Sequence, residues 1–114
     1  MVVVLASLPT PFVVDVSAGA GGAVSIRVAG ELDVATAPEL GEALRRQAAL
    51  GRDVVLDLAG VEFIDSTGVV VVWQAIAEAK MRGCELSIRD ALPPSVRRIM
   101  DLTALLPELP LVAA

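Results

Sequence analysis

The chain carries a short polar cluster between two strongly apolar runs, and this junction constrains the fold more than any other feature. The cluster is DSTG, residues 65–68, and the run VVVVW follows it directly. β-branched residues favour a strand over residues 54–58. The residues after the cluster, up to Gly83, have the composition and apolar spacing of a helix from about Thr67 to Arg82. The sequence therefore predicts a buried strand and a buried helix joined by a polar loop.

Further strand and helix signals lie on both sides of this junction. Residues 24–28 alternate apolar and polar positions, which predicts a half-buried strand. Thr36 followed by Glu39 fits a capping box, so a helix is expected from there to Gly51. The remaining expected elements are a strand over residues 11–16, a glycine-rich turn over 17–23, a strand over 84–89, a helix from Pro94 to Asp101, and a turn with an edge strand in the tail LLPELPLV.

This order predicts an α/β fold with a mixed sheet of four to five strands. Strands that alternate with helices indicate parallel pairing, and the N-terminal hairpin adds an antiparallel strand. The 114 residues suit a single domain, 1–114, with its core at about 11–106. Apolar residues make up 55% of the chain and aromatic residues only 3%, so the core must be aliphatic. Helical spacing also assigns Trp73 and Met81 to the core, and Asp57 is expected to be a structural residue at the end of a strand.

Composition excludes several function classes. The chain has no histidine and a single cysteine, Cys84, which rules out His-dependent nucleophile triads and zinc sites built on His or several Cys. No glycine-rich phosphate loop is present. The net charge is −5 without a basic run, which argues against nucleic acid. We therefore expect no enzyme activity, no metal and no cofactor. The N-terminus lacks a basic signal region and no apolar run is long enough for a span, so a cytoplasmic protein without membrane insertion is expected.

The polar cluster is the best candidate for a functional site. In open α/β sheets, ligands bind at the carboxyl edge of the strands, where this cluster is expected. A helix N-terminus there favours negative charge, including phosphate. The loop that carries Glu31 and Asp33 should emerge at the same edge. The simpler alternative is that Ser66 or Thr67 only caps the helix.

Two blocks of sequence resemble a known family. GELDVATAPEL, residues 30–40, and VVLDLAGVEFIDSTG, residues 54–68, in this order and spacing, resemble the STAS domain of the anti-sigma factor antagonists. LPPSVRRIMDLTAL is similar to a later helix region of the family. The similarity extends over about residues 11–106 and implies the STAS fold.

The resemblance implies a regulatory function. Such proteins bind an anti-sigma factor that is also an ATP-dependent Ser/Thr kinase, and binding releases the sigma factor. Phosphorylation of a hydroxyl in the polar cluster switches the antagonist off, and a Ser/Thr phosphatase reverses it. We assign the phosphate to Thr67, with Ser66 as the second choice and as the helix cap. Expected partner contacts are Asp65, Ser66, Gly68, Glu31 and Asp33.

One other function fits the same resemblance. A STAS domain can serve as a scaffold in another assembly, such as an accessory subunit of a transport system or a sensor complex. The intact polar cluster favours the anti-sigma factor antagonist over this alternative.

Overall fold

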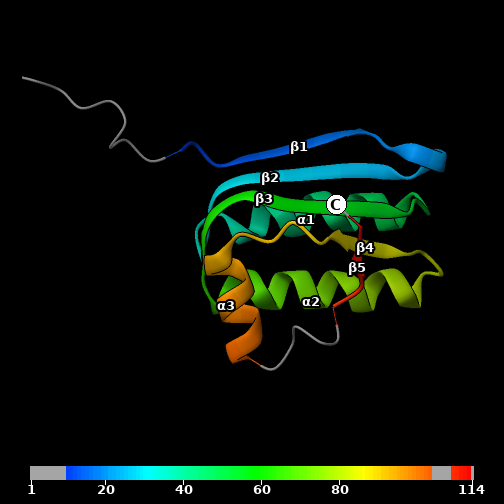
Figure 1. The fold of residues 1–114 in the computed structure, drawn as a ribbon. Coiled ribbons are helices and arrows are strands. Elements are labelled where there is room, and N and C mark those ends of the chain that lie inside the picture. The colour runs from blue at the N-terminus through cyan, green and yellow to red at the C-terminus, as the bar shows by residue number, and fades with distance from the viewer. Residues whose placement is uncertain (1–9, 104–108, 114) are drawn as a thin grey trace, which may run out of the picture.

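The computed structural model describes residues 10–103 and 109–113, which form one five-stranded sheet with three α-helices (Figure 1). The strands follow one another across the sheet in the order β1-β2-β3-β4-β5. β1 pairs with β2 antiparallel, and all other neighbours are parallel. The elements are β1 (Val13–Ala18), the 3-10 turn η2 (Ala20–Gly22), β2 (Val24–Leu32), α1 (Ala37–Ala49), β3 (Val54–Ile64), α2 (Ser66–Met81), β4 (Leu86–Arg89), α3 (Pro94–Leu102) and β5 (Leu111–Val112).

The predicted fold class, the N-terminal hairpin and the edge strand in the tail are confirmed. The end of the predicted core near residue 106 lies outside the described residues. Among the helices of the described residues, none is long and apolar enough to cross a membrane.

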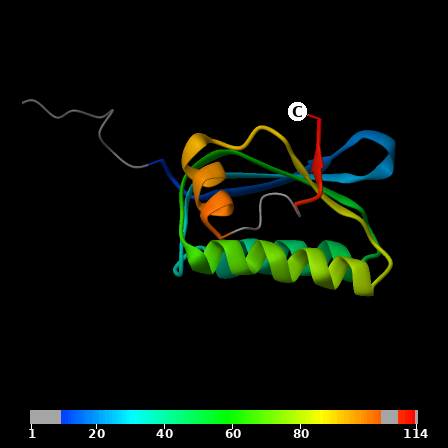
Figure 2. The same ribbon diagram turned by 60° about the horizontal axis from the view of Figure 1, so that its bottom comes forward.

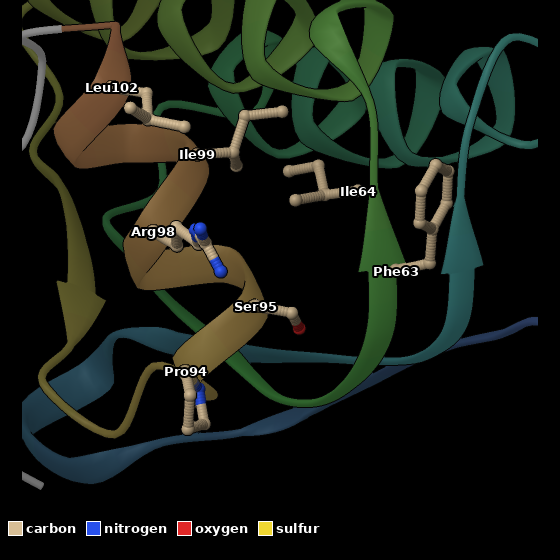
Figure 3. Close-up of a pocket in the computed structure, with 7 residues that line it drawn as sticks. All are labelled: Phe63, Ile64, Pro94, Ser95, Arg98, Ile99 and Leu102. Carbon is tan, nitrogen blue, oxygen red and sulfur yellow. The ribbon is translucent and has the colours of Figure 1, made fainter.

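The helices α1 and α2 lie side by side on one face of the sheet (Figures 1 and 2). Alternate residues of β2 and β3 point into this layer, because successive strand residues face opposite sides. The core between sheet and helices is aliphatic, as the composition predicts. Its fully buried side chains include Ile26, Val28, Leu32, Leu40, Leu56, Leu58, Val72 and Ile88. The shorter helix α3 lies at the end of β3, and a cleft remains between them (Figure 3).

The strand β3 is longer than predicted. It continues past Gly60 to Ile64, and its last residue pairs with Leu32, the last residue of β2. Val61 and Ile64 are buried at 1% and 4% exposure, so pairing through this segment adds to the core. The expected loop therefore does not exist: only Asp65 separates β3 from α2.

Two residues assigned to the core by helical spacing are placed differently. Met81 is 88% exposed, because it is the last residue of α2. Trp73 is only partly buried and packs against the edge of the core. The inward stripe of α2 consists of smaller side chains, Val69, Val72, Ala75, Ile76 and Ala79. This stripe lets the helix approach the sheet closely.

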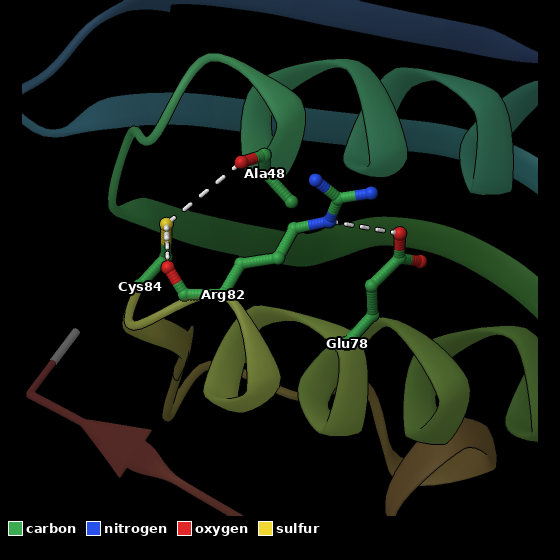
Figure 4. A network of polar contacts seen from close by, with 4 residues as sticks. All are labelled: Ala48, Glu78, Arg82 and Cys84. Carbon is green, nitrogen blue, oxygen red and sulfur yellow. Dashed lines mark hydrogen bonds and ion pairs between the residues drawn. The ribbon is translucent and has the colours of Figure 1, made fainter.

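The far end of α2 is joined to the end of α1 around the single cysteine (Figure 4). Cys84 is buried, and its Sγ lies 3.9 Å from the carbonyl oxygen of Ala48 and 3.8 Å from that of Arg82. Arg82 also pairs with Glu78 one helical turn earlier, with 3.3 Å between Nε and Oε1. These contacts make Cys84 a packing residue of the helix layer.

The outer face of the sheet carries a row of alternating charges. Asp15 pairs with Arg27 in register, and Arg27 pairs with Asp57 on β3. The Asp57 carboxylate lies 3.9 Å from Arg27 Nε and 4.0 Å from Arg89 Nε, and it accepts a hydrogen bond from the backbone N–H of Ala59. Asp57 is therefore structural, although it lies within β3 rather than at its end.

The start of α2 is seated on the strand ends through Gly68. A Cβ added to Gly68 would lie 2.8 Å from Ile64 Cγ1 and 2.9 Å from both Cγ and the carbonyl oxygen of Leu32. Such distances require the helix to shift. Glycine inside a helix costs about 1 kcal/mol relative to alanine, so its presence here serves the close packing of α2 on β2 and β3.

We predict that Gly68→Ala destabilises the protein by about 1–3 kcal/mol, because the added methyl group overpacks the contact with Leu32. Gly41→Ala is the matched control. A Cβ there would meet the mobile end of Arg45 at 3.1 Å and Val71 at an ordinary 3.5 Å. Because alanine has a higher helix propensity than glycine, Gly41→Ala should leave stability unchanged or raise it by up to ~1 kcal/mol. Urea unfolding monitored by circular dichroism measures both, and equal effects of the two substitutions would contradict the seating role of Gly68.

Candidate functional site

The polar cluster lies where β2 and β3 end side by side. Leu32 and Ile64 are paired, and the backbone N–H of Asp65 donates to the carbonyl oxygen of Leu32 at 3.2 Å. The helix α2 begins at Ser66. Glu31 and Asp33 lie at the end of β2 and just after it, so the sheet brings both expected acidic residues to the edge that carries the cluster. We call this region, residues 31–34 and 63–70, the α2 edge.

Asp65 is the N-cap of α2. Its backbone is extended, and its Oδ1 accepts a hydrogen bond from the Gly68 N–H at 3.1 Å. The prediction that Ser66 caps the helix is therefore wrong. The pattern alone could not separate the two, because Asp and Ser are almost equally good caps. The structure makes Ser66 the first residue of the helix, exposed, and Thr67 the second, partly buried.

The loop after β2 is held by its own side chains. The Asp33 Oδ1 accepts from the backbone N–H groups of Ala35 and Thr36 at 3.0 and 3.2 Å. The Thr36 hydroxyl donates to the Glu31 carbonyl oxygen at 2.7 Å and accepts from the Asp33 N–H at 2.9 Å. Thr36 stands at the N-cap position of α1 without a side-chain cap bond, so the predicted capping box with Glu39 is wrong. Its hydroxyl is used by the loop instead.

The α2 edge is acidic. It carries the carboxylates of Glu31, Asp33 and Asp65, and it contains no Lys or Arg. Glu31 is exposed, whereas Asp33 and Asp65 are partly buried and each uses a carboxylate oxygen for backbone hydrogen bonds. Within the described residues, no group of three His, Cys, Asp or Glu side chains could hold a metal ion. A negatively charged group added at Ser66 would therefore raise an existing negative charge.

Exposed apolar side chains at the same edge were missed by sequence reasoning. They are Val34 at 71%, Phe63 at 49% and Val70 at 49% exposure. Phe63 precedes the buried Ile64, and strand alternation alone would have placed it outward had β3 been predicted long enough. Apolar side chains of this kind form the centre of protein interfaces. The α2 edge thus combines a free hydroxyl, carboxylates and apolar contact surface.

Gly68 differs from the other expected contact residues, because it is buried beneath the first turn of α2. Its N–H is already bonded to Asp65. The structure therefore gives Gly68 a role in seating the helix, while Asp65, Ser66, Glu31 and Asp33 remain partly or fully accessible at the surface.

Comparison with known proteins agrees with this architecture. The family model of the STAS domain matches residues 15–114. The anti-sigma-B factor antagonist of Bacillus subtilis is 34% identical over 82 residues, which cover 72% of this chain and 74% of that protein. The crystal structure of an anti-sigma factor antagonist from Mycobacterium paratuberculosis aligns with a TM-score of 0.75 at 29% identity, covering 91% of this chain and 87% of that one.

The fold also matches the Bacillus cell fate determinant SpoIIAA in its phosphorylated form, with a TM-score of 0.69 at 19% identity over 90% of this chain and 91% of that chain. The family match spans almost all of the sheet and every helix, and the B. subtilis relative exceeds 30% identity over most of both chains. The chain therefore belongs to the STAS domain family and, within it, to the anti-sigma factor antagonists.

Proposed function

We propose that this protein binds an anti-sigma factor with ATP-dependent Ser/Thr kinase activity and thereby releases a sigma factor. The observation that carries the proposal is the free hydroxyl of Ser66 at the α2 edge, beside exposed apolar side chains and carboxylates. The names of the relatives, which are anti-sigma factor antagonists, support an anti-sigma factor as the partner. Proposed contacts are Asp65, Ser66, Glu31 and Asp33, joined by Phe63, Val34 and Val70.

The phosphoacceptor we propose is Ser66, with Thr67 second. The sequence predicts the opposite order, Thr67 before Ser66, because it assigns Ser66 as the helix cap. Because Asp65 supplies the cap, the Ser66 hydroxyl is not needed to close the helix end. Ser66 is also exposed, whereas Thr67 is partly buried in the first turn. A kinase active site must reach the hydroxyl oxygen, so exposure favours Ser66.

Phosphate at this position changes charge without requiring the helix to unfold. The group adds about −1.5 to −2 charges and three acceptor oxygens. The first-turn N–H groups and the helix dipole favour a negative charge there, so α2 tolerates it. Across the interface the same charge adds to Glu31, Asp33 and Asp65, and like-charge contacts there cost up to several kcal/mol. We propose that phosphorylation weakens partner binding in this way and that a Ser/Thr phosphatase restores it.

The protein itself acts as a binding module and kinase substrate, and we propose that it works in the cytoplasm. It contacts neither nucleic acid nor the membrane interior in this role. We propose that the chain itself holds no metal or other cofactor, since the kinase partner supplies the site for ATP and its Mg²⁺.

The first prediction from this proposal concerns the phosphoacceptor. After pull-down and mass spectrometry identify the anti-sigma factor, incubation with it and ATP should place phosphate on Ser66. Ser66→Ala should abolish this phosphate and leave stability within ~0.5 kcal/mol, as for other surface positions. Ser66→Glu should weaken binding only in part, because a carboxylate carries less charge than a phosphate. Phosphate on Thr67 with Ser66 unmodified would reverse the order again, and unchanged binding of the phosphorylated chain would refute the switch.

A second prediction separates the cap from the charge at Asp65. Asp65→Ala should cost about 1 kcal/mol of folding stability, because the Gly68 N–H loses its acceptor. Asp65→Asn keeps a cap oxygen and should remain close to wild type in stability. Thermal unfolding of both variants measures this difference. Equal losses for the two variants would mean that the carboxylate charge, and not the hydrogen bond, stabilises α2.

A third prediction is that the purified chain alone does not turn over ATP. It has no phosphate loop and no histidine. Phosphate release in the presence of ATP and Mg²⁺ should equal the buffer control, while addition of the captured kinase should transfer label to the chain. Turnover by the chain alone that disappears in a Ser66→Ala or Asp65→Asn variant would contradict this.

A further inference from the structure

A cleft of about 490 Å³ lies next to the α2 edge, between the end of β3 and α3 (Figure 3). Most of its lining is apolar. Ile64 on β3 and Ile99 on α3 point toward one another across it. The remaining lining residues are Phe63, Pro94, Ser95, Arg98 and Leu102. Phe63 is 49% exposed and Leu102 76% exposed, so apolar surface extends from the cleft to the outside.

Among the described residues that line the cleft, Arg98 is the single charged one. Its neighbour Arg97 pairs with Asp90, whereas Arg98 makes no ion pair within the described residues. The carboxylate of Glu62, which precedes the lining residue Phe63, accepts a hydrogen bond from the Thr10 hydroxyl. A guanidinium beside apolar walls, in a chain of net charge −5, favours an acidic group on whatever occupies the cleft.

The shape of the cleft favours a protein rather than a small molecule. Small-molecule sites bury most of the ligand surface. Within the part of the chain that the structure describes, the walls come from the end of β3 and from α3, so these walls would leave a small ligand largely in water. The cleft is also continuous with the α2 edge, because Phe63 and Ile64 in its wall immediately precede Asp65. A protein bound at Ser66 could therefore contact the α2 edge and the cleft through one continuous interface.

We infer that the cleft is a second anchor for the anti-sigma factor, which inserts an apolar side chain flanked by an Asp or Glu that pairs with Arg98. The inference rests on the proposed function and deepens it. The edge then has two electrostatic poles: carboxylates around Ser66 and a cation on α3. A partner that matches both poles is fixed in one orientation.

The proposed ion pair between Arg98 and an acidic residue of the partner is tested with Arg98→Glu in the full chain. Its affinity for the captured anti-sigma factor should fall roughly tenfold or more, as for reversal of a charge in a complementary interface, and the loss should shrink at high salt. Arg98→Lys should retain most of the affinity. Arg52→Glu is the matched control, because it changes net charge equally at an exposed position just before β3, at the opposite end of this strand, and should have little effect. Binding by Arg98→Glu within twofold of wild type would overturn the inference.

The occupant is tested with a benzophenone amino acid in place of Leu102. Irradiation should crosslink it to a partner peptide that contains an apolar residue beside an Asp or Glu. The same group in place of Met81, which is 88% exposed at the other end of α2, should give no specific crosslink. A crosslink to residues 1–9 of the same chain, or to a second copy, would assign the cleft to that occupant and overturn the inference.

The two proposals fail separately. Weak binding of Ser66→Glu with normal binding of Arg98→Glu leaves the proposed function standing and removes the second anchor. Weak binding of Arg98→Glu, together with tight binding of Ser66→Glu and of the phosphorylated protein, supports the second anchor and refutes the phosphorylation switch.

Discussion

The close contact between Gly68 and Leu32 is the constraint on which the site depends. There is no room for a Cβ between the first turn of α2 and the end of β2. This contact lets α2 begin one residue after β3, so the cluster is a rigid corner and not a loop. A hydroxyl on such a corner has a fixed position relative to the carboxylates of the neighbouring loop. The packing of α2 on the end of β2 therefore both completes the core and positions the Ser66 hydroxyl at the surface.

The residues of the polar cluster divide the structural and functional work. Asp65 closes the helix end, and Gly68 provides both the N–H that Asp65 binds and the space for the helix. Ser66 is left exposed, and its hydroxyl makes no hydrogen bond to another described residue. Modification of Ser66 therefore leaves the hydrogen bond between Asp65 and the Gly68 N–H, which closes the helix end, in place. The proposed switch acts on the surface charge, while the fold stays constant.

The sequence was sufficient to predict the order of the elements, the mixed sheet and the edge where the cluster lies. These features follow from periodicity and from turn residues, which are local signals. The length of β3 depended instead on pairing with β2 beyond Gly60, where register shifts disguise the alternation. The identity of the cap depended on which of two adjacent residues has extended backbone. The exposure of Met81 depended on where α2 ends. Each of these is decided by tertiary contacts that no local pattern records.

Negative and positive charges lie on opposite sides of the proposed interface. Glu31, Asp33 and Asp65 lie at the ends of β2 and β3, and Arg98 lies across the cleft on α3. A phosphate on Ser66 increases the negative pole and leaves the positive pole unchanged. Its repulsion is therefore local and acts within a Debye length of about 10 Å in 0.1 M salt. Apolar contacts at the cleft are not screened in this way. The balance between a screened repulsion and an unscreened apolar anchor then sets how completely phosphorylation releases the partner, and ionic strength shifts that balance.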